Sequence, residues 1–253
     1  MWDEPQQLNK LSKLLLAFSL LLLLAGTLRY VLRLPIFPLQ SVVLKQVPMQ
    51  VTKEEIEQAV QRSVRGNFFA VNLNQTRQAF EQLPWVRKAS VRRKFPWSLE
   101  VELEEHVAFA RWNDNAFVNT FGEVFMDQVT SITAPPNLSS LPIFIGQPEN
   151  SREILQQYVA LQTTLQPMKK DITQIVLSPR FAWQVQLNNG MTVDLGREQM
   201  TQRLSRFVKV YPYSLAAWDG SVKHVDLRYR NGFAAYFPNG MVVKRNLENK
   251  VQG

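Results

Sequence analysis

An uncharged apolar run near the N-terminus constrains this chain more than any other feature. Residues 14–28 read LLLAFSLLLLLAGTL and contain no charged side chain. Apolar residues resume after Arg29, so the stretch from Leu11 to Leu32 reaches the roughly 20 residues that a membrane-spanning helix needs. We therefore predict one membrane helix over residues 14–34, preceded by a short head of residues 1–13.

Two questions about this segment stay open at the level of sequence. A cleaved signal sequence also has a short apolar core, but the one triplet that resembles a cleavage site, Ala25-Gly26-Thr27, ends in a poor residue. The length and the flanking charges favour a retained anchor over a cleaved signal. The orientation is undecided, because two basic residues lie on each side of the run.

Composition limits the chemistry that the chain can perform. It contains no cysteine, which excludes disulfide bonds, thiolate catalysis and cysteine-ligated zinc. His106 and His224 are its only histidines, so one chain cannot build a multi-histidine metal site. No phosphate-binding loop, dinucleotide fingerprint or nucleophile elbow is present. We therefore expect no catalytic residue, no metal and no cofactor.

The residues after the membrane segment predict a small α/β domain over residues 36–106. Thr52 and Glu55 have the spacing of a capping box, which opens a helix. A second short helix ends before Pro84, since proline cannot continue a helix. The expected order is an extended stretch, a helix opening at Thr52, a helix at about 74–83, and strands at about 85–95 and 98–106.

The basic segment between Arg87 and Lys94 raises the question of nucleic-acid binding. It carries five cations within eight residues and lies between Trp85 and Trp97, and basic residues interleaved with aromatics are typical of nucleic-acid surfaces. The next strand, SLEVELEE, alternates apolar and acidic residues. If the apolar residues share one face, the carboxylates lie beside the cations on the other face.

This alternation favours a paired, solvent-exposed strand face over a polyanion-binding surface. We expect a three-residue turn, Pro96-Trp97-Ser98, that places Arg92 opposite Glu102 and Lys94 opposite Glu100. A phosphate-binding surface needs uncompensated charge, and we therefore expect no nucleic-acid partner. The acidic residues at 100–105 could also supply paired carboxylates for glycosidic chemistry, but the alternation makes a structural role the better interpretation.

From residue 107 to about residue 245 the pattern predicts a β-rich domain with two helices. One helix is expected at about 151–165 and the other at about 197–211, where Met200, Leu204, Phe207, Val208 and Tyr211 follow helical spacing. Residues 246–253 form a polar tail. The fold class is thus α+β: one N-terminal membrane helix, a small β-α-α-β-β domain, and a mixed β-rich domain with helices.

The last two predicted strands have the features of a docking site. A two-residue turn at Asn231-Gly232 would place Tyr229 opposite Ala234 and Asp226 opposite Phe237. In this register Val225, Leu227 and Tyr229 share the core face with Ala234 and Tyr236. Phe233 and Phe237 then lie on the polar face, where exposed aromatics suggest a partner. The equally weighted alternative is that a neighbouring loop or helix covers them.

Several short motifs resemble those of the bacterial FtsQ/DivIB cell-division family, and together they span nearly the whole chain. The matching segments are Arg65–Phe69 (RGNFF), Leu83–Val86 (LPWV), Val91–Pro96 (VRRKFP), Leu99–Val101 (LEV), Glu105–Ala108 (EHVA), Ala110–Trp112 (ARW), Leu195–Arg197 (LGR), Arg203–Phe207 (RLSRF) and Val225–Tyr229 (VDLRY).

The resemblance implies a POTRA domain at 36–106 and the family's β domain at 107–245, both periplasmic, with the N-terminus in the cytoplasm and the protein enriched at the septum. It implies a non-enzymatic inner-membrane scaffold that links early division proteins to the septal synthase and binds FtsB and FtsL, with FtsK, FtsW and FtsI as further partners. No small-molecule substrate is implied. The alternatives are a membrane-anchored cell-wall enzyme and a POTRA-type chaperone or transport module.

In the family, FtsB adds a strand beside the last strand of the β domain. The positions of this chain that match the binding residues are Arg197, Arg228, Tyr229, Asn231, Gly232, Phe233, Ala234, Ala235, Tyr236 and Phe237. Some members carry Ser where this chain has Asn231 and Trp where it has Phe237. At these two positions the chain departs from those members.

Overall fold

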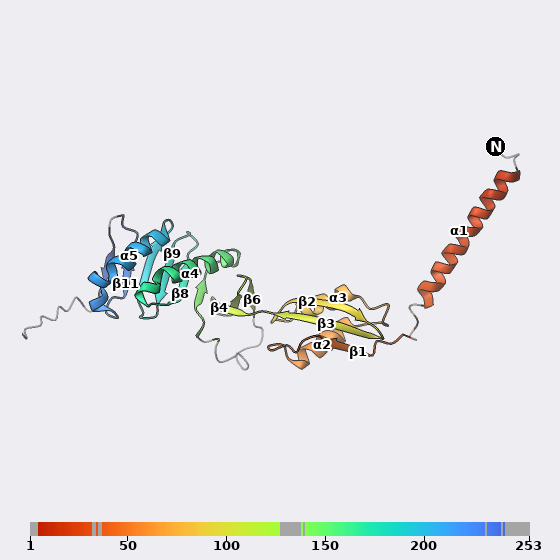
Figure 1. Ribbon diagram of the computed structural model, residues 1–253, viewed down its shortest axis with the longest axis horizontal. Helices are drawn as coiled ribbons and strands as arrows, with labels where there is room; N and C mark the ends of the chain where they lie inside the picture. The colour runs from red at the N-terminus through yellow and green to blue at the C-terminus, as the bar shows by residue number, and fades with distance from the viewer. Residues whose placement is uncertain are drawn as a thin grey trace, which may run out of the picture. The chain divides into compact units, whose positions relative to one another are not determined.

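The computed structural model describes residues 5–31, 34, 37–126, 138, 140–230, 232–238 and 240 (Figure 1). The first residues of the predicted head (1–4), the site residue Asn231 and the predicted tail 246–253 lie outside these ranges. The chain divides into two compact units, residues 1–106 and 107–253. We describe each unit separately.

The N-terminal helix α1 (Pro5–Val31) covers residues 14–31 of the predicted membrane segment 14–34. Residues Asn9–Val31 form a helix of 23 residues that is long and apolar enough to cross a membrane, and none of it is buried against protein. The helix begins before residue 14, because the polar residues of the head are good helix formers and Pro5 suits a first helical position. Two of its hydroxyls are satisfied within the helix: Ser12 Oγ donates to the Asn9 carbonyl at 3.1 Å and Thr27 Oγ1 to the Leu23 carbonyl at 2.8 Å.

The rest of the first unit is a three-stranded sheet with two helices, which confirms the predicted β-α-α-β-β order. Strand β1 (Ser41–Leu44) runs parallel to the central β3 (Ser98–Glu105), and β2 (Val86–Lys94) pairs antiparallel with β3 on its other side. Helices α2 (Lys53–Ser63) and α3 (Leu73–Glu81) follow β1 in the chain. The predicted capping box is present, with the Thr52 and Glu55 side chains each bonded to the other residue's backbone N–H.

The predicted register of β2 and β3 is wrong by two residues, although the predicted faces are right. Arg92 lies opposite Glu100 and Lys94 opposite Ser98, so the turn is Phe95-Pro96-Trp97. A two-residue shift keeps every side chain on its face, and the apolar alternation cannot distinguish the two registers. The packing of the Trp97 ring on Phe37, at 5.4 Å between centroids, accompanies the observed turn and is not visible in the strand pattern.

Arg92 and Lys94 of this hairpin are paired with a carboxylate, as the alternation predicted; Lys94 has its predicted partner, Glu100, whereas Arg92 pairs with Glu100 and not with Glu102. Glu100 forms ion pairs with both Arg92 and Lys94, and its carboxylate lies 3.3 Å from Lys94 Nζ. The hydrogen bond from Arg92 lowers the pKa of Glu100. Glu102 instead pairs with Lys45, which follows β1, at 2.7 Å. The guanidinium of Arg93 donates to three loop carbonyls, those of Phe68, Phe69 and Val71.

The second unit is built on a nine-stranded mixed sheet with the strand order β12-β11-β10-β9-β8-β7-β4-β5-β6. Helices α4 (Ser151–Leu165) and α5 (Met200–Ser214) interrupt the strands, close to the predicted bounds. The strands are β4 (Ala108–Trp112), β5 (Ala116–Asn119), β6 (Val124–Met126), β7 (Ile143–Ile145), β8 (Ile172–Leu177), β9 (Trp183–Leu187), β10 (Thr192–Gly196), β11 (His224–Asp226) and β12 (Ala234–Tyr236).

Helices α4 and α5 lie side by side against one face of this sheet (Figure 1). In β9 the side chains of Trp183, Val185 and Leu187 are buried in the core that the helices cover, while Gln184 and Gln186 are half-buried on the other face. This alternation is typical of a sheet with one covered and one solvated face. The α5 stripe contributes Leu204, Phe207, Val208 and Tyr211 to the core, as its helical spacing predicted.

Candidate protein-binding edge of the nine-stranded sheet

Strand β12 is the last strand at one edge of the sheet and pairs only with β11 among the described strands. It is three residues long, and its second edge has no partner strand within the described residues. An unpaired edge presents backbone N–H and C=O groups that another chain can pair with. Among the described strands β6 forms the other edge of the sheet, so the β12 edge is one of two places in the unit where a strand can be added.

The predicted hairpin register at this edge is wrong. His224 pairs with Tyr236, Val225 with Ala235 and Asp226 with Ala234, so residues 227–233 connect the strands in place of a two-residue turn. The connection is held by contacts that the strand pattern does not show. Arg228 folds back onto Asp226, and the Arg206 guanidinium donates to the Arg230 carbonyl.

The shift in register exchanges the two faces of β12. Phe233 and Phe237, which the predicted register places on the polar face, face the helices and pack against the core. The Phe233 ring lies 5.2 Å from Phe207 of α5, edge to face, and the Phe237 ring lies 6.3 Å from Trp218 of the short helix η4 (Ala216–Trp218). The alternative that a neighbouring helix covers these rings is thus confirmed.

The side chains that β12 presents to solvent are those predicted to lie in the core. Tyr236 is 61% exposed, Ala234 is exposed, and Ala235 between them packs inward. Tyr229, in the connection, is 57% exposed. One tyrosine is thus exposed on the open edge strand and a second in the connection that leads to it, and tyrosine is enriched where proteins bind one another.

An ion pair stiffens the connection next to this surface. Arg228 donates from Nε and Nη2 to the two carboxylate oxygens of Asp226, at 2.9 and 2.7 Å, and its backbone N–H donates to Asp226 Oδ1 at 2.9 Å. The side-chain hydrogen bond is the main reason that the pKa of Asp226 is lowered and that of Arg228 is raised. Bidentate pairing of this kind fixes orientation as well as adding energy.

The end of β10 supports the Arg228 side chain through Gly196. This glycine has φ +80°, and a Cβ there would lie 2.6 Å from Arg203 Nη1 and 3.2 Å from Arg228 Cγ. Arg203 Nη1 donates to the Leu195 carbonyl at 2.9 Å. The neighbouring Arg197 is exposed, and its guanidinium has no partner among the described residues. The two arginines predicted as binding residues, Arg197 and Arg228, are thus brought to the same end of β10.

A second polar pair on the solvated face was missed in the sequence. Asp194 of β10 accepts from Gln184 Nε2 at 2.7 Å and lies 3.1 Å from His224 Nε2. The missed signal is a repeated tripeptide, Val-Asp-Leu, at 193–195 and 225–227. The two copies pair with each other in parallel, Val193 with Val225 and Asp194 with Asp226.

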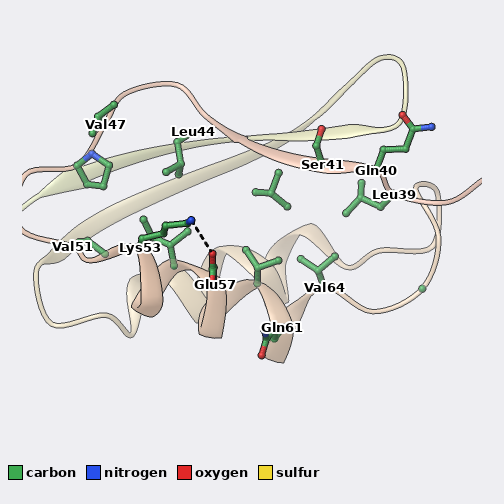
Figure 2. A pocket seen from close by; sticks show the side chains of 15 residues that line it. Leu39, Gln40, Ser41, Leu44, Val47, Val51, Lys53, Glu57, Gln61 and Val64 are labelled. Atoms are coloured by element: carbon green, nitrogen blue, oxygen red, sulfur yellow. Dashed lines mark ion pairs between the residues drawn. The ribbon is translucent and has the colours of Figure 1, made fainter.

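The first unit has a separate concave surface, a groove of about 790 Å³ between β1 and α2 (Figure 2). Its ion pair, Lys53 Nζ to Glu57 Oε1 at 3.7 Å, lies on the α2 side and is internally neutral. The groove therefore favours apolar over charged ligands. Its apolar lining is Leu39, Val42, Leu44, Val47, Pro48, Val51, Ile56, Val60 and Val64.

Two protein-family models match the chain. The model described as "POTRA domain, FtsQ-type" matches residues 37–106, and the model described as "Cell division protein FtsQ/DivIB, C-terminal" matches residues 110–228. The second match ends one residue before Tyr229, so β12 lies beyond it. Within the described residues, no cluster of three or more His, Asp or Glu side chains could hold a metal ion.

Relatives resemble the chain along most of its length. It is 39% identical over 240 residues to the cell division protein FtsQ of Nitrosospira multiformis, covering 93% of this chain and 98% of that protein. It is 35% identical over 238 residues to FtsQ of Burkholderia pseudomallei, with 92% and 93% covered. FtsQ of Neisseria gonorrhoeae is 30% identical over 249 residues, with 98% and 100% covered. The chain therefore belongs to the FtsQ/DivIB family of cell division proteins.

Proposed function

We propose that this chain is a non-enzymatic scaffold of the divisome, anchored in the inner membrane by α1 with its N-terminus in the cytoplasm. Its POTRA and nine-stranded domains then lie in the periplasm, where the protein links early and late division proteins at the septum. We infer that FtsB, as part of the FtsB–FtsL pair, adds a strand beside β12. The observation that carries this proposal is the open edge of β12 with Tyr236 exposed beside it.

Backbone pairing alone is too weak to account for such a complex. A net backbone hydrogen bond contributes about 0.5–1.5 kcal/mol, so pairing along three residues gains only a few kcal/mol. Association itself costs at least about 4 kcal/mol in lost freedom. Side chains must therefore supply the difference, and Tyr229 and Tyr236 are the large exposed groups at this edge.

The stiff connection between β11 and β12 lowers the cost of binding. Arg228 is already held by Asp226, and the Arg230 carbonyl by Arg206, before any partner arrives. Phe233 anchors the start of β12 on α5. A preorganised edge loses less conformational entropy when a strand is added.

The proposal is tested by mixing the purified full-length chain in detergent with purified FtsB–FtsL and measuring the mass of the complex by light scattering. Ala234→Arg places a long charged side chain on the exposed face of β12 and is expected to abolish the complex. Met49→Arg, at a 91% exposed position of the other unit, is the matched control and should bind normally. Undiminished binding by Ala234→Arg would refute strand addition at β12.

The absence of enzymatic activity is a separate part of the proposal. The purified full-length chain should leave peptidoglycan and its lipid-linked precursor unchanged. Hydrolysis or transfer by the pure chain would contradict the scaffold role and favour a membrane-anchored cell-wall enzyme.

A further inference from the structure

One end of the POTRA domain carries a cluster of aromatic side chains, which we call the aromatic tip: Phe37, Phe69, Phe95 and Trp97. They surround Phe68, which is fully buried. Trp97 stacks on Phe37 at 5.4 Å, Phe69 meets Phe37 edge to face at 5.2 Å, and Phe95 meets Phe68 at 5.2 Å. The tip thus joins the β2–β3 turn, the loop after α2 and the segment that leaves the membrane helix.

Only five residues, 32–36, separate Phe37 of this tip from Val31 at the end of α1. The helix ends at Val31, and the Leu34 carbonyl already accepts a hydrogen bond from Asn67 Nδ2 at 2.7 Å. Three extended residues span at most about 10 Å. The Phe68 N–H donates to the Phe37 carbonyl at 2.9 Å. This is a second hydrogen bond between the segment that follows α1 and the loop after α2. Chain length alone therefore keeps the tip close to the point where α1 ends.

The tip exposes a large apolar group that the protein leaves uncovered. Phe95 is 72% exposed, and the prolines on either side of the cluster, Pro38 and Pro96, are exposed as well. Aromatic rings are enriched at the level of lipid headgroups, where an amphipathic environment suits them. The domain is fastened to the chain at Leu34, which lies within about 10 Å of the end of α1, so this exposed ring is in a position to meet that environment.

The charges around the tip also suit a lipid surface. Arg65, Arg92, Arg93 and Lys94 lie at this end of the domain, and Glu100 is the carboxylate that pairs with two of them, so four cations and one anion give a net charge of +3. The remaining carboxylates of β3 are engaged further along the strand. Glu102 binds Lys45, Glu104 binds Arg87, and Glu105 accepts from the backbone N–H groups of Met49, Gln50 and Val51.

We propose that the aromatic tip is a lipid-binding surface that seats the POTRA domain on the headgroups of the bilayer spanned by α1. Phe95 enters the headgroup layer, and the surrounding cations lie against lipid phosphates. This lipid contact fixes the distance between the POTRA domain and the membrane surface. It rests on the proposed anchoring of α1, and the test below separates the two claims.

The test uses the absence of cysteine from the chain, which makes every introduced thiol a unique labelling site. Full-length variants are labelled with an environment-sensitive fluorophore and reconstituted into lipid nanodiscs that contain an anionic phospholipid and a headgroup-nitroxide quencher lipid. Phe95→Cys reports the tip, and Lys94→Cys repeats the measurement with the aromatic ring kept. Leu22→Cys, in the middle of α1, reports insertion of the helix.

Met49→Cys is the matched control on the same domain. Met49 is 91% exposed and is bonded through its backbone to Glu105, at the opposite end of β3 from the tip. We expect blue-shifted emission and severalfold stronger quenching for labels at positions 94 and 95 than for the label at position 49. If the labels at positions 94 and 95 are quenched no more strongly than the label at position 49, while the label at position 22 reports an apolar environment, lipid binding by the aromatic tip is refuted. The anchoring of α1 in the membrane would then still stand. A label at 22 that reports water would overturn both.

Discussion

The two faces of β12 predict opposite consequences for two aromatic substitutions three residues apart. Phe233 packs edge to face on Phe207 and is half-buried, whereas Tyr236 is 61% exposed on the other face. Replacing a fully buried phenylalanine by alanine costs about 3–5 kcal/mol. For the half-buried Phe233 we expect Phe233→Ala to cost about 2 kcal/mol of domain stability, including the loss of its ring pair.

Tyr236→Ala should leave stability within about 0.5 kcal/mol of the wild type, because surface substitutions seldom change it further. It should nevertheless weaken FtsB–FtsL binding by about 2 kcal/mol, or roughly 30-fold, if Tyr236 is an interface anchor. Stability is read from hydrogen exchange of peptides covering β10 and β11 in the full-length chain, and affinity from titration calorimetry.

The reasoning would be refuted by the reverse result. Full hydrogen-exchange protection in Phe233→Ala would show that Phe233 does not hold β12 on α5. Unchanged affinity in Tyr236→Ala, with the fold intact, would show that the exposed face of β12 is not the partner's surface.

Three further predictions concern the surroundings of the edge and the POTRA hairpin. Gly196→Ala should destabilise the nine-stranded domain by about 1–2 kcal/mol and weaken partner binding, because a Cβ at φ +80° is strained and would press on Arg203 and Arg228; a thermal melt that matches the wild type would contradict this. Asp226 has a lowered pKa through its hydrogen bond with Arg228, so its contribution to stability is present above its unfolded pKa of about 3.9 and is lost as the pH falls through the folded value. Melts between about pH 5 and pH 2 should therefore show a smaller acid-induced loss for Asp226→Asn than for the wild type, and equal losses would count against the pair. Arg93→Ala removes three hydrogen bonds to loop carbonyls and should cost the POTRA domain about 2 kcal/mol, whereas Arg92→Ala, which breaks only an exposed ion pair, should change its denaturation midpoint little; equal effects would contradict the assignment.

Local patterns in the sequence were sufficient to predict the elements and most of their faces. Helical spacing identified the buried stripe of α5, and the Thr52–Glu55 spacing identified the start of α2. These signals succeed because the interactions behind them connect residues three or four positions apart. The alternation of β2 and β3 also gave the correct faces, since parity along a strand is a local property.

The register and the exposed face of β12 could not be obtained in this way. The Asn-Gly pair at 231–232 suggested a tight turn, but the observed connection depends on Phe233 packing on Phe207 and on Arg206 reaching the Arg230 carbonyl. These contacts join residues more than twenty positions apart, which no local pattern encodes. The candidate edge was thus located from the sequence, while the side chains that it exposes are known only from the fold.

The most direct test of the central claim is the hydrogen exchange of the backbone amides of Phe233–Phe237, measured in the full-length chain with and without FtsB–FtsL. Strand addition pairs the free edge of β12 with backbone groups of the partner, and it should slow the exchange of amides in this segment when the complex forms. Amides at Met49 and Gln50 serve as an internal reference in the other unit. Saturating binding that leaves the exchange of residues 233–237 unchanged would contradict the account.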